Sequence, residues 1–161
     1  MSDYPRYLKG RPVPDDILAV DPGVSGGFAI GHGGSVKLYP FKTESEFLDL
    51  LDGRKFRTAV VEEVPPYVGR AIPGSSAFKL GYNYGFEVGV LRAKGIPVHL
   101  VRPQVWQKGL SGLGKLTGAP RKRMLKDNAI RLYPNLGKIT LACADALLIL
   151  HWFEAVHARR T

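Results

Sequence analysis

Short apolar runs separated by polar and glycine-rich turns follow the first 16 residues, and their spacing predicts a set of strands. The run 17–21 (ILAVD) ends in a carboxylate followed by Pro-Gly, which is typical of a buried strand with a turn after it. Two more strands are predicted over 27–32 and 36–40, with Gly33-Gly34 between them as a hairpin signal. This part of the chain therefore predicts a three-stranded meander.

Strand and helix patterns alternate over the rest of the chain. Thr43 followed by Glu46 resembles a capping box and predicts a helix that ends at Gly53. The later elements are expected as a strand over 58–64, a helix over 76–94, a strand over 97–101, a mobile glycine-rich loop over 109–120, and helices over 121–133 and 139–157. Three strands followed by this alternation predict an α/β fold in which helices flank a mixed five-stranded sheet.

Length and composition limit the class of protein. The chain has 161 residues, the size of one domain with a substantial core, and we expect an N-terminal tail over 1–16 and a single domain over 17–158. No apolar run approaches the roughly 20 residues of a membrane span, and the N-terminus lacks the apolar stretch of a signal peptide. Cys143 is the single cysteine, which excludes an internal disulfide. We therefore expect a soluble, cytoplasmic protein that is not secreted and has no membrane partner.

Positive charge is concentrated in one segment. The net charge is +9, and residues 102–138 contain nine basic residues and a single acid, Asp127. Such a block on an otherwise balanced chain indicates a polyanionic partner, and nucleic acid is favoured over a membrane because the segment lacks a strong apolar face. A solvated, lysine-rich surface is the alternative explanation.

Three carboxylates occupy positions where the pattern predicts burial. Asp21 ends the first predicted strand, and Glu62 lies near the end of the fourth, beside Glu63. Asp145 is the only charged residue of the apolar stretch 141–150. A buried ionised carboxylate is costly unless it is paired or binds a metal. Acids at the ends of two core strands and on an apolar helix can meet at one edge of the sheet.

Each carboxylate also has a simpler explanation. Asp21 fits an Asp-Pro-Gly turn, and one of Glu62 and Glu63 must face the opposite side of the sheet, as a solvated strand residue would. Asp145 could pair with a buried arginine. Convergence favours a joint site, and three crowded acids need a cation. Without a His or Cys cluster, these ligands favour two Mg²⁺ or Mn²⁺ ions that activate water against a phosphodiester, as in a nuclease.

Four segments of the chain resemble motifs of one nuclease family. They are ILAVDPG at 17–23, VEEV at 61–64, SAFKLG at 76–81 with Gly85 after it, and ADAL at 144–147. In this order and spacing they resemble the RuvC family of Holliday junction resolvases, within the RNase H-like superfamily. The segment 103–108 (PQVWQK) and the basic helix after it are most similar to bacteriophage-type members, which implies a bacterial or phage-infected cell.

The resemblance implies an RNase H-like fold and a set of catalytic residues. It assigns Asp21, Glu62 and Asp145 as catalytic ligands of two Mg²⁺ or Mn²⁺ ions. Some members of the family also place a lysine near the scissile phosphate, and the candidates here are Lys115 and Lys122.

The chain departs from the family at one position of the metal site. Members often carry a fourth ligand, Asp or His, three or four residues before the last Asp, where this sequence has Ala142 and Leu141. The site then works with three acids, recruits Glu63, or uses another group. The coordination of the second ion is therefore left open.

Glycines recur on one face of the helix predicted over 76–94. They stand at i, i+4 and i+8, and each interior glycine costs about 1 kcal/mol relative to alanine, so close approach of another helix or backbone is expected. The resemblance identifies this helix as the interface of a homodimer, formed by Gly81, Gly85 and Gly89.

The basic segment and one loop supply the candidate contacts to four-way junction DNA. Tyr67 follows the Glu62 strand and is a candidate for stacking on an unpaired base, with a core-covering role as the alternative. Trp106 is expected as a core anchor. The predicted DNA-binding residues are Tyr67, Arg70, Lys108, Lys115, Arg121, Lys122, Arg123 and Lys126.

These patterns lead to one hypothesis and two alternatives. The leading hypothesis is a homodimeric, metal-dependent endonuclease that resolves four-way DNA junctions by symmetric phosphodiester hydrolysis. The first alternative keeps the fold but acts as a general RNase H-like nuclease on branched DNA or hybrids. The second is a non-catalytic, junction-binding dimer whose site has decayed.

Overall fold

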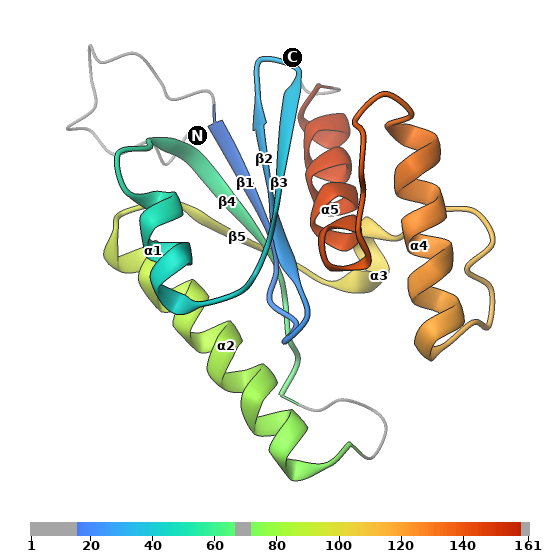
Figure 1. Ribbon diagram of the computed structural model, residues 1–161, viewed down its shortest axis with the longest axis horizontal. Coiled ribbons are helices and arrows are strands. Elements are labelled where there is room, and N and C mark those ends of the chain that lie inside the picture. Colours follow the sequence, from blue (N-terminus) through green and yellow to red (C-terminus); the bar gives the residue numbers. More distant parts are fainter. Residues whose placement is uncertain (1–15, 67–71, 159–161) are drawn as a thin grey trace.

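The computed structural model describes residues 16–66 and 72–158 as one sheet with helices around it (Figure 1). The strands are β1 (Asp16–Asp21), β2 (Gly27–His32), β3 (Ser35–Pro40), β4 (Phe56–Glu62) and β5 (Val98–Val101). The helices are α1 (Glu44–Leu51), α2 (Gly74–Ala93), α3 (Pro103–Trp106), α4 (Gly118–Leu132) and α5 (Leu141–Ala158).

The five strands form a mixed sheet in the order β3-β2-β1-β4-β5. β1, β2 and β3 pair antiparallel, as the predicted meander requires, and β1, β4 and β5 pair parallel. Figure 1 shows α1 and α2 on one side of the sheet and α3, α4 and α5 on the other. The predicted α/β fold with a mixed five-stranded sheet flanked by helices is confirmed.

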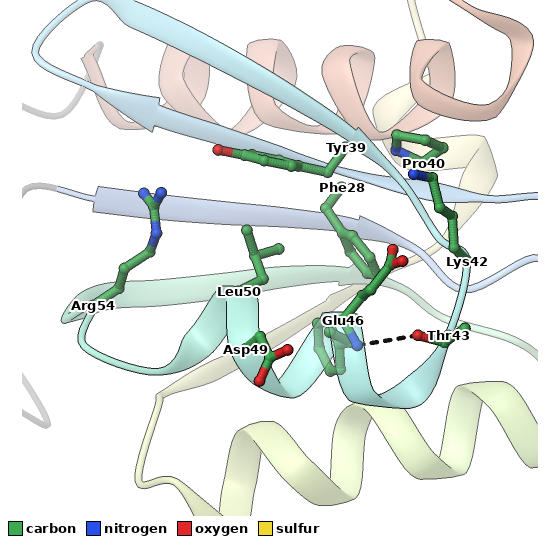
Figure 2. Close-up of a pocket in the computed structure, with 10 residues that line it drawn as sticks. Phe28, Tyr39, Pro40, Lys42, Thr43, Glu46, Asp49, Leu50 and Arg54 are labelled. Carbon is green, nitrogen blue, oxygen red and sulfur yellow. Dashed lines mark hydrogen bonds between the residues drawn. The ribbon is translucent and has the colours of Figure 1, made fainter.

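Two local signals in the sequence produce the structures expected of them. Gly33 and Gly34 have φ angles of 53° and 83°, the left-handed conformations that a tight turn between β2 and β3 requires. Thr43 caps α1, because its Oγ1 accepts a hydrogen bond from the Glu46 N–H at 3.1 Å (Figure 2). The hairpin turn and the helix cap therefore each depend on residues no more than three positions apart in the sequence.

The core consists of two clusters, one on each face of the sheet. Ile17 and Ala19 of β1 belong to the cluster that packs against α4 and α5, together with Val60 of β4. Leu18 and Val20 belong to the cluster on the side of α1 and α2. This alternation along β1 and β4 decides which side chains at the strand ends point toward α5.

The structure corrects several element boundaries. The short helix α3 was not predicted; Pro103 begins it, at the position where the missing N–H of proline costs least. Strand β4 covers 56–62 rather than 58–64, so Glu63 follows the strand. The segment 109–120 is not a free loop throughout, because α4 already begins at Gly118.

One buried side chain also forms hydrogen bonds with the glycine-rich segment before α4. Asn128, 5% exposed, accepts from the Ser111 N–H at 3.1 Å and donates to the Ser111 carbonyl at 2.8 Å. The segment is therefore not free at this point, because Asn128 of the helix that follows it, 17 positions from Ser111, supplies the hydrogen bonds.

The first strand begins close to its expected start. β1 begins at Asp16, one residue before the expected start, and residues 1–15 of the expected tail lie outside the described residues. Over residues 16–66 and 72–158, every helix is too short or too polar to cross a lipid bilayer.

Candidate active site

Asp21 and Glu62 meet because two parallel strands end together. Val20 of β1 is paired with Val61 of β4, so the residues that follow them lie side by side at the carboxyl ends of the strands. Strand alternation points both carboxyl groups toward the α5 side of the sheet. The topology thus juxtaposes two acids that lie 41 positions apart in the sequence.

Asp21 is buried, and only one of its two carboxylate oxygens has a hydrogen-bond partner among the described residues. Its side chain is 6% exposed, and Oδ1 accepts a hydrogen bond from the Gly23 N–H at 3.1 Å. Oδ2 is buried and has no hydrogen-bond partner among the described residues. Burial raises the pKa of Asp21, and the Gly23 hydrogen bond and the charge of Lys122 oppose part of that rise. Oδ2 is therefore free to bind a cation.

Glu62 is held by an indole from α3. Its Oε2 accepts a hydrogen bond from Nε1 of Trp106 at 2.7 Å. Burial, followed by the nearby charge of Asp21, raises the pKa of Glu62 to about 8. Trp106, expected only as a core anchor, is 2% exposed and also orients this carboxylate. No sequence pattern links these two residues, because the contact depends on how α3 packs beside β4.

Asp145 reaches the site from the first turns of α5. The helix packs closely on β2, because a Cβ at Gly27 would lie 2.8 Å from the Ala142 carbonyl oxygen. Asp145 is half-buried, and burial together with the charge of Asp21 raises its pKa to about 7. The carboxyl charges thus act on one another from three separate elements.

One lysine lies near all three carboxyl groups. The positive charge of Lys122 on α4 lowers the pKa of Asp21, Glu62 and Asp145 in part, against the effect of burial. Lys115 instead lies before α4, where it lines a hollow with Arg121. Of the two candidate lysines, Lys122 is the one whose charge acts on all three acids.

The donor set fits a hard divalent cation. Among the described residues, no three His, Cys, Asp or Glu side chains are arranged close enough to hold a metal ion as they stand. Asp21 nevertheless leaves one buried oxygen unpaired, and the acids raise one another's pKa, so a cation would relieve both the unpaired oxygen and the repulsion. Carboxylate oxygens without nitrogen or sulfur ligands suit Mg²⁺ or Mn²⁺.

Glu63, considered as a substitute ligand, is engaged elsewhere. Its Oε2 accepts a hydrogen bond from Nε of Arg102 at 3.0 Å, which forms an ion pair beside β5. The suggestion that Glu63 completes the metal site is not supported. The positions corresponding to the family's fourth ligand carry no donor side chain, and Leu141 there is 46% exposed.

A fourth acid near Asp21 was missed by the sequence interpretation. Glu87 of α2 is 0% exposed, and burial followed by the charge of Asp21 raises its pKa to about 9. Asn83, one turn earlier, is 8% exposed. A signal was present, because Glu87 is the only acid of the helix and lies on the stripe formed by Val88 and Leu91. Like Asp145, Glu87 is a single acid among apolar residues of a helix.

Several predicted DNA-binding residues surround two adjoining hollows between α3 and α4. Lys108 and Arg121 line one of about 470 Å³, and Lys115 and Arg121 line one of about 430 Å³. Arg121 donates to the Leu116 carbonyl at 3.2 Å and to Gln107. The remaining predicted positions are Arg123, exposed on α4, Lys126, half-buried there, and Tyr67 and Arg70, which lie outside the described residues.

No other part of the described chain packs against the glycine face of α2. Gly81, Gly85 and Gly89 are exposed, and a Cβ added at any of them would meet nothing within 4 Å. Phe78 and Tyr82 on the same helix are 72% and 58% exposed. The close approach that these glycines predict is therefore not made by another part of the described chain.

A cavity of about 370 Å³ lies away from the candidate site, between α1 and the β2–β3 hairpin. Figure 2 shows Tyr39 and Leu50 along it, with Lys42 and Arg54 toward its two ends. None of the predicted site residues lines this cavity. The acidic site at the strand ends is therefore the better candidate for chemistry.

Comparison with known proteins supports the fold. No protein-family model and no curated protein matches this sequence. Two solved structures of RuvC from Thermus thermophilus are similar to it. The one in complex with Holliday junction substrate has a TM-score of 0.62 and 20% identity, covering 90% of this chain and 95% of that one. The other has a TM-score of 0.59 and 22% identity, covering 90% and 96%. The resemblance drawn from the motifs is thus confirmed at the level of the RNase H-like fold.

Proposed function

We propose that the protein is a metal-dependent endonuclease that resolves four-way DNA junctions as a homodimer. The observation that carries this proposal is the convergence of Asp21, Glu62 and Asp145 at the carboxyl ends of β1 and β4, beside Lys122. The fold that holds them is shared with a RuvC in complex with Holliday junction substrate.

The three acids would hold two Mg²⁺ or Mn²⁺ ions. Bound there, the ions supply an activated water and stabilise the leaving oxygen of a phosphodiester. Asp21 contributes its unpaired Oδ2, while the Trp106 indole keeps Glu62 turned toward the site. Lys122 would neutralise the scissile phosphate, a role supported by the effect of its charge on all three acids.

Phosphate recognition is assigned to the basic surface of α3, α4 and the segment between them. Lys108, Lys115 and Arg121 line polar hollows there, and Arg123 is exposed on α4. Contacts of this kind fix the register of a nucleic acid without reading its bases. Preference for a junction over linear duplex would then come from the shape of the DNA.

The homodimer is assigned to the open face of α2. The bare glycine positions allow a second helix to approach closely, and Phe78 and Tyr82 beside them supply apolar area. A twofold dimer presents two equivalent sites, which symmetric cleavage of a junction requires.

Cleavage of a synthetic four-way junction tests the proposal. Asp21→Asn removes a charged ligand with almost no change in volume, so we expect cleavage in Mg²⁺ to fall by at least about a thousandfold while junction binding is retained. Asp49→Asn, on the exposed surface of α1, is the matched control and should cleave like the wild type.

Two outcomes favour the alternatives. Equal cleavage of flaps, hybrids and junctions would make the protein a general RNase H-like nuclease. Tight junction binding without cleavage in Mg²⁺ or Mn²⁺ would make it a binding module. Cleavage that survives in Asp21→Asn would reject the assigned site.

A further inference from the structure

Two buried polar side chains of α2 lie beneath the turn that follows Asp21. Asn83 and Glu87 are 8% and 0% exposed, on a helix face that is otherwise buried through Val88 and Leu91. Oε2 of Glu87 has no hydrogen-bond partner among the described residues. Polar groups so deeply buried are destabilising unless they make specific contacts, so their placement needs an explanation.

Asn83 and Asp21 hydrogen-bond to opposite ends of one peptide unit. Asn83 Nδ2 donates to the Pro22 carbonyl oxygen at 3.1 Å. The N–H of that same peptide, which belongs to Gly23, donates to Asp21 Oδ1 at 3.1 Å. The peptide plane between Pro22 and Gly23 therefore connects the α2 amide to the Asp21 carboxylate.

Glu87 completes this chain of hydrogen bonds on the helix side. Its Oε1 accepts from Asn83 Nδ2 at 3.4 Å, so both N–H groups of the amide have acceptors. Hydrogen bonds in series polarise one another, and a peptide that accepts at its carbonyl becomes a better donor at its N–H.

We infer that Asn83, oriented by Glu87, is a positioning residue for Asp21. The inference rests on the proposed function, in that Asp21 is taken as a metal ligand. By holding the Pro22–Gly23 peptide, Asn83 keeps Oδ1 engaged and leaves Oδ2 as the oxygen that would bind the cation. Groups that orient a ligand in this way typically change metal affinity or activity by about 10–100-fold when removed.

Four variants separate positioning from stability. Asn83→Leu removes the donor with little change in volume, and Asn83→Ala tests the same contact if the leucine variant does not fold. Glu87→Gln keeps an acceptor for Asn83, so it is the conservative variant. Val88→Ala, next to Glu87 and 6% exposed, is the matched control because it destabilises the same helix without touching the hydrogen bonds.

The first readout reports on the peptide itself and needs neither metal nor DNA. Labelling proline at its carbonyl carbon and glycine at nitrogen selects the two Pro-Gly pairs of the chain, which end at Gly23 and Gly74. In Asn83→Leu we expect the Gly23 amide signal to move and that of the exposed Gly74 to stay. Glu87→Gln and Val88→Ala should leave Gly23 near its wild-type position.

The second and third readouts are Mn²⁺ affinity, measured by electron paramagnetic resonance, and the single-turnover cleavage rate. Asn83→Leu should weaken Mn²⁺ binding and slow cleavage by about tenfold or more, with junction affinity unchanged. Glu87→Gln should resemble the wild type. A Gly23 signal and Mn²⁺ affinity that stay at wild-type values in Asn83→Leu would overturn the inference, as would equal changes in Val88→Ala.

The outcomes also distinguish this inference from the proposed function. If the wild type binds Mn²⁺ but cleaves no junction, and Asn83→Leu still weakens Mn²⁺ binding, the positioning role stands and the resolvase proposal fails. If the wild type cleaves junctions and Asn83→Leu behaves like Val88→Ala, the positioning role alone is rejected.

Discussion

Each carboxyl group of the candidate site is held by a different kind of contact. Asp21 is fixed by the turn that follows it, Glu62 by an indole from another helix, and Asp145 by the packing of α5 on β2. Burial is the largest cause of the raised pKa in all three. A proton must therefore leave this cluster before a cation can bind, which couples metal binding to pH.

The stability of the metal-free protein should fall as the pH rises. The pKa of Glu62 increases from 4.5 to about 8 on folding, and that of Asp145 from 3.8 to about 7. Between those limits the folded state binds more protons than the unfolded state, so its free energy of unfolding decreases with pH. Thermal unfolding in a chelator should show a Tm several degrees lower at about pH 8 than at about pH 5.

Metal and mutation provide the controls for that pH dependence. Mg²⁺ should raise the Tm more at the higher pH, where the carboxylates are ionised. Glu62→Gln cannot titrate and should show a weaker dependence on pH. A Tm that rises steadily with pH in the metal-free protein would contradict the burial of these acids.

Alanine variants of the two candidate lysines should differ in which quantity they change, the cleavage rate or the junction affinity. Lys122 lies near all three acids, so Lys122→Ala is expected to lower the cleavage rate by about 10–100-fold with junction affinity little changed. Lys115→Ala should mainly weaken junction binding, because Lys115 lines a surface hollow with Arg121. Single-turnover rates and binding curves for both variants test this, and the reverse pattern would assign the phosphate contact to Lys115.

At the scale of elements, α2 has two faces with different tasks. Its buried face carries Val88 and Leu91 for the core and Asn83 for the turn after Asp21. Its opposite face carries exposed glycines, where a side chain would meet nothing within the chain. The helix that we assign to the dimer interface thus also contacts the turn after Asp21.

Gly85→Arg should disrupt the dimer without unfolding the subunit. A Cβ at this position contacts nothing, and replacing a helical glycine removes a cost of up to about 1 kcal/mol, so subunit stability should be unchanged or slightly higher. The bulky charge would prevent a second helix from approaching, and we expect the dimer dissociation constant to rise at least about a hundredfold. Sedimentation velocity measures this.

A matched control for the dimer experiment is available on α1. Asp49→Arg places an arginine on an exposed position of that helix, and it should sediment like the wild type. If Gly85→Arg remains dimeric, the α2 face is not the interface and another surface must provide the second site.

At the scale of the whole molecule, most of the basic residues lie apart from the three acids. Asp21 and Glu62 end β1 and β4 and Asp145 lies on α5, while the basic residues lie on α4 and in the segment between α3 and α4, where Lys122 alone acts on all three acids. This arrangement can attract a polyanion while leaving the acids largely unneutralised, because most of the cations are exposed on the surface.

Junction affinity should therefore depend strongly on salt. Each phosphate neutralised contributes about one unit to the slope of log affinity against log salt concentration, so Lys108→Ala should reduce that slope by about one per subunit. Lys37→Ala, exposed on β3 away from the basic segment, is the control and should leave the slope unchanged. An unchanged slope in Lys108→Ala would remove this residue from the DNA surface.

Features that depend on residues close together in the sequence were predicted, and features that depend on tertiary contacts were not. The strands, the hairpin at Gly33 and Gly34 and the cap at Thr43 depend on residues a few positions apart, and each was readable in the sequence. Two features were not predicted from the sequence. The helix α3 is only four residues long, and the 109–120 segment is anchored by the side chain of Asn128, which lies on α4.

The sequence by itself determined which acids stand at the ends of apolar runs, since an ionisable residue in such a run is visible without coordinates. Apart from the short helix α3, it also determined the order of strands and helices, because the periodicity of apolar positions differs between the two. Only the tertiary structure decided that Trp106 holds Glu62, that the charge of Lys122 acts on all three acids and that Asn83 holds the turn after Asp21. Trp106 and Glu62 are 44 positions apart, Asn83 and Pro22 are 61 apart, and Lys122 is between 23 and 101 positions from the three acids. The distances between these side chains are set by the packing of helices on the sheet rather than by any local pattern.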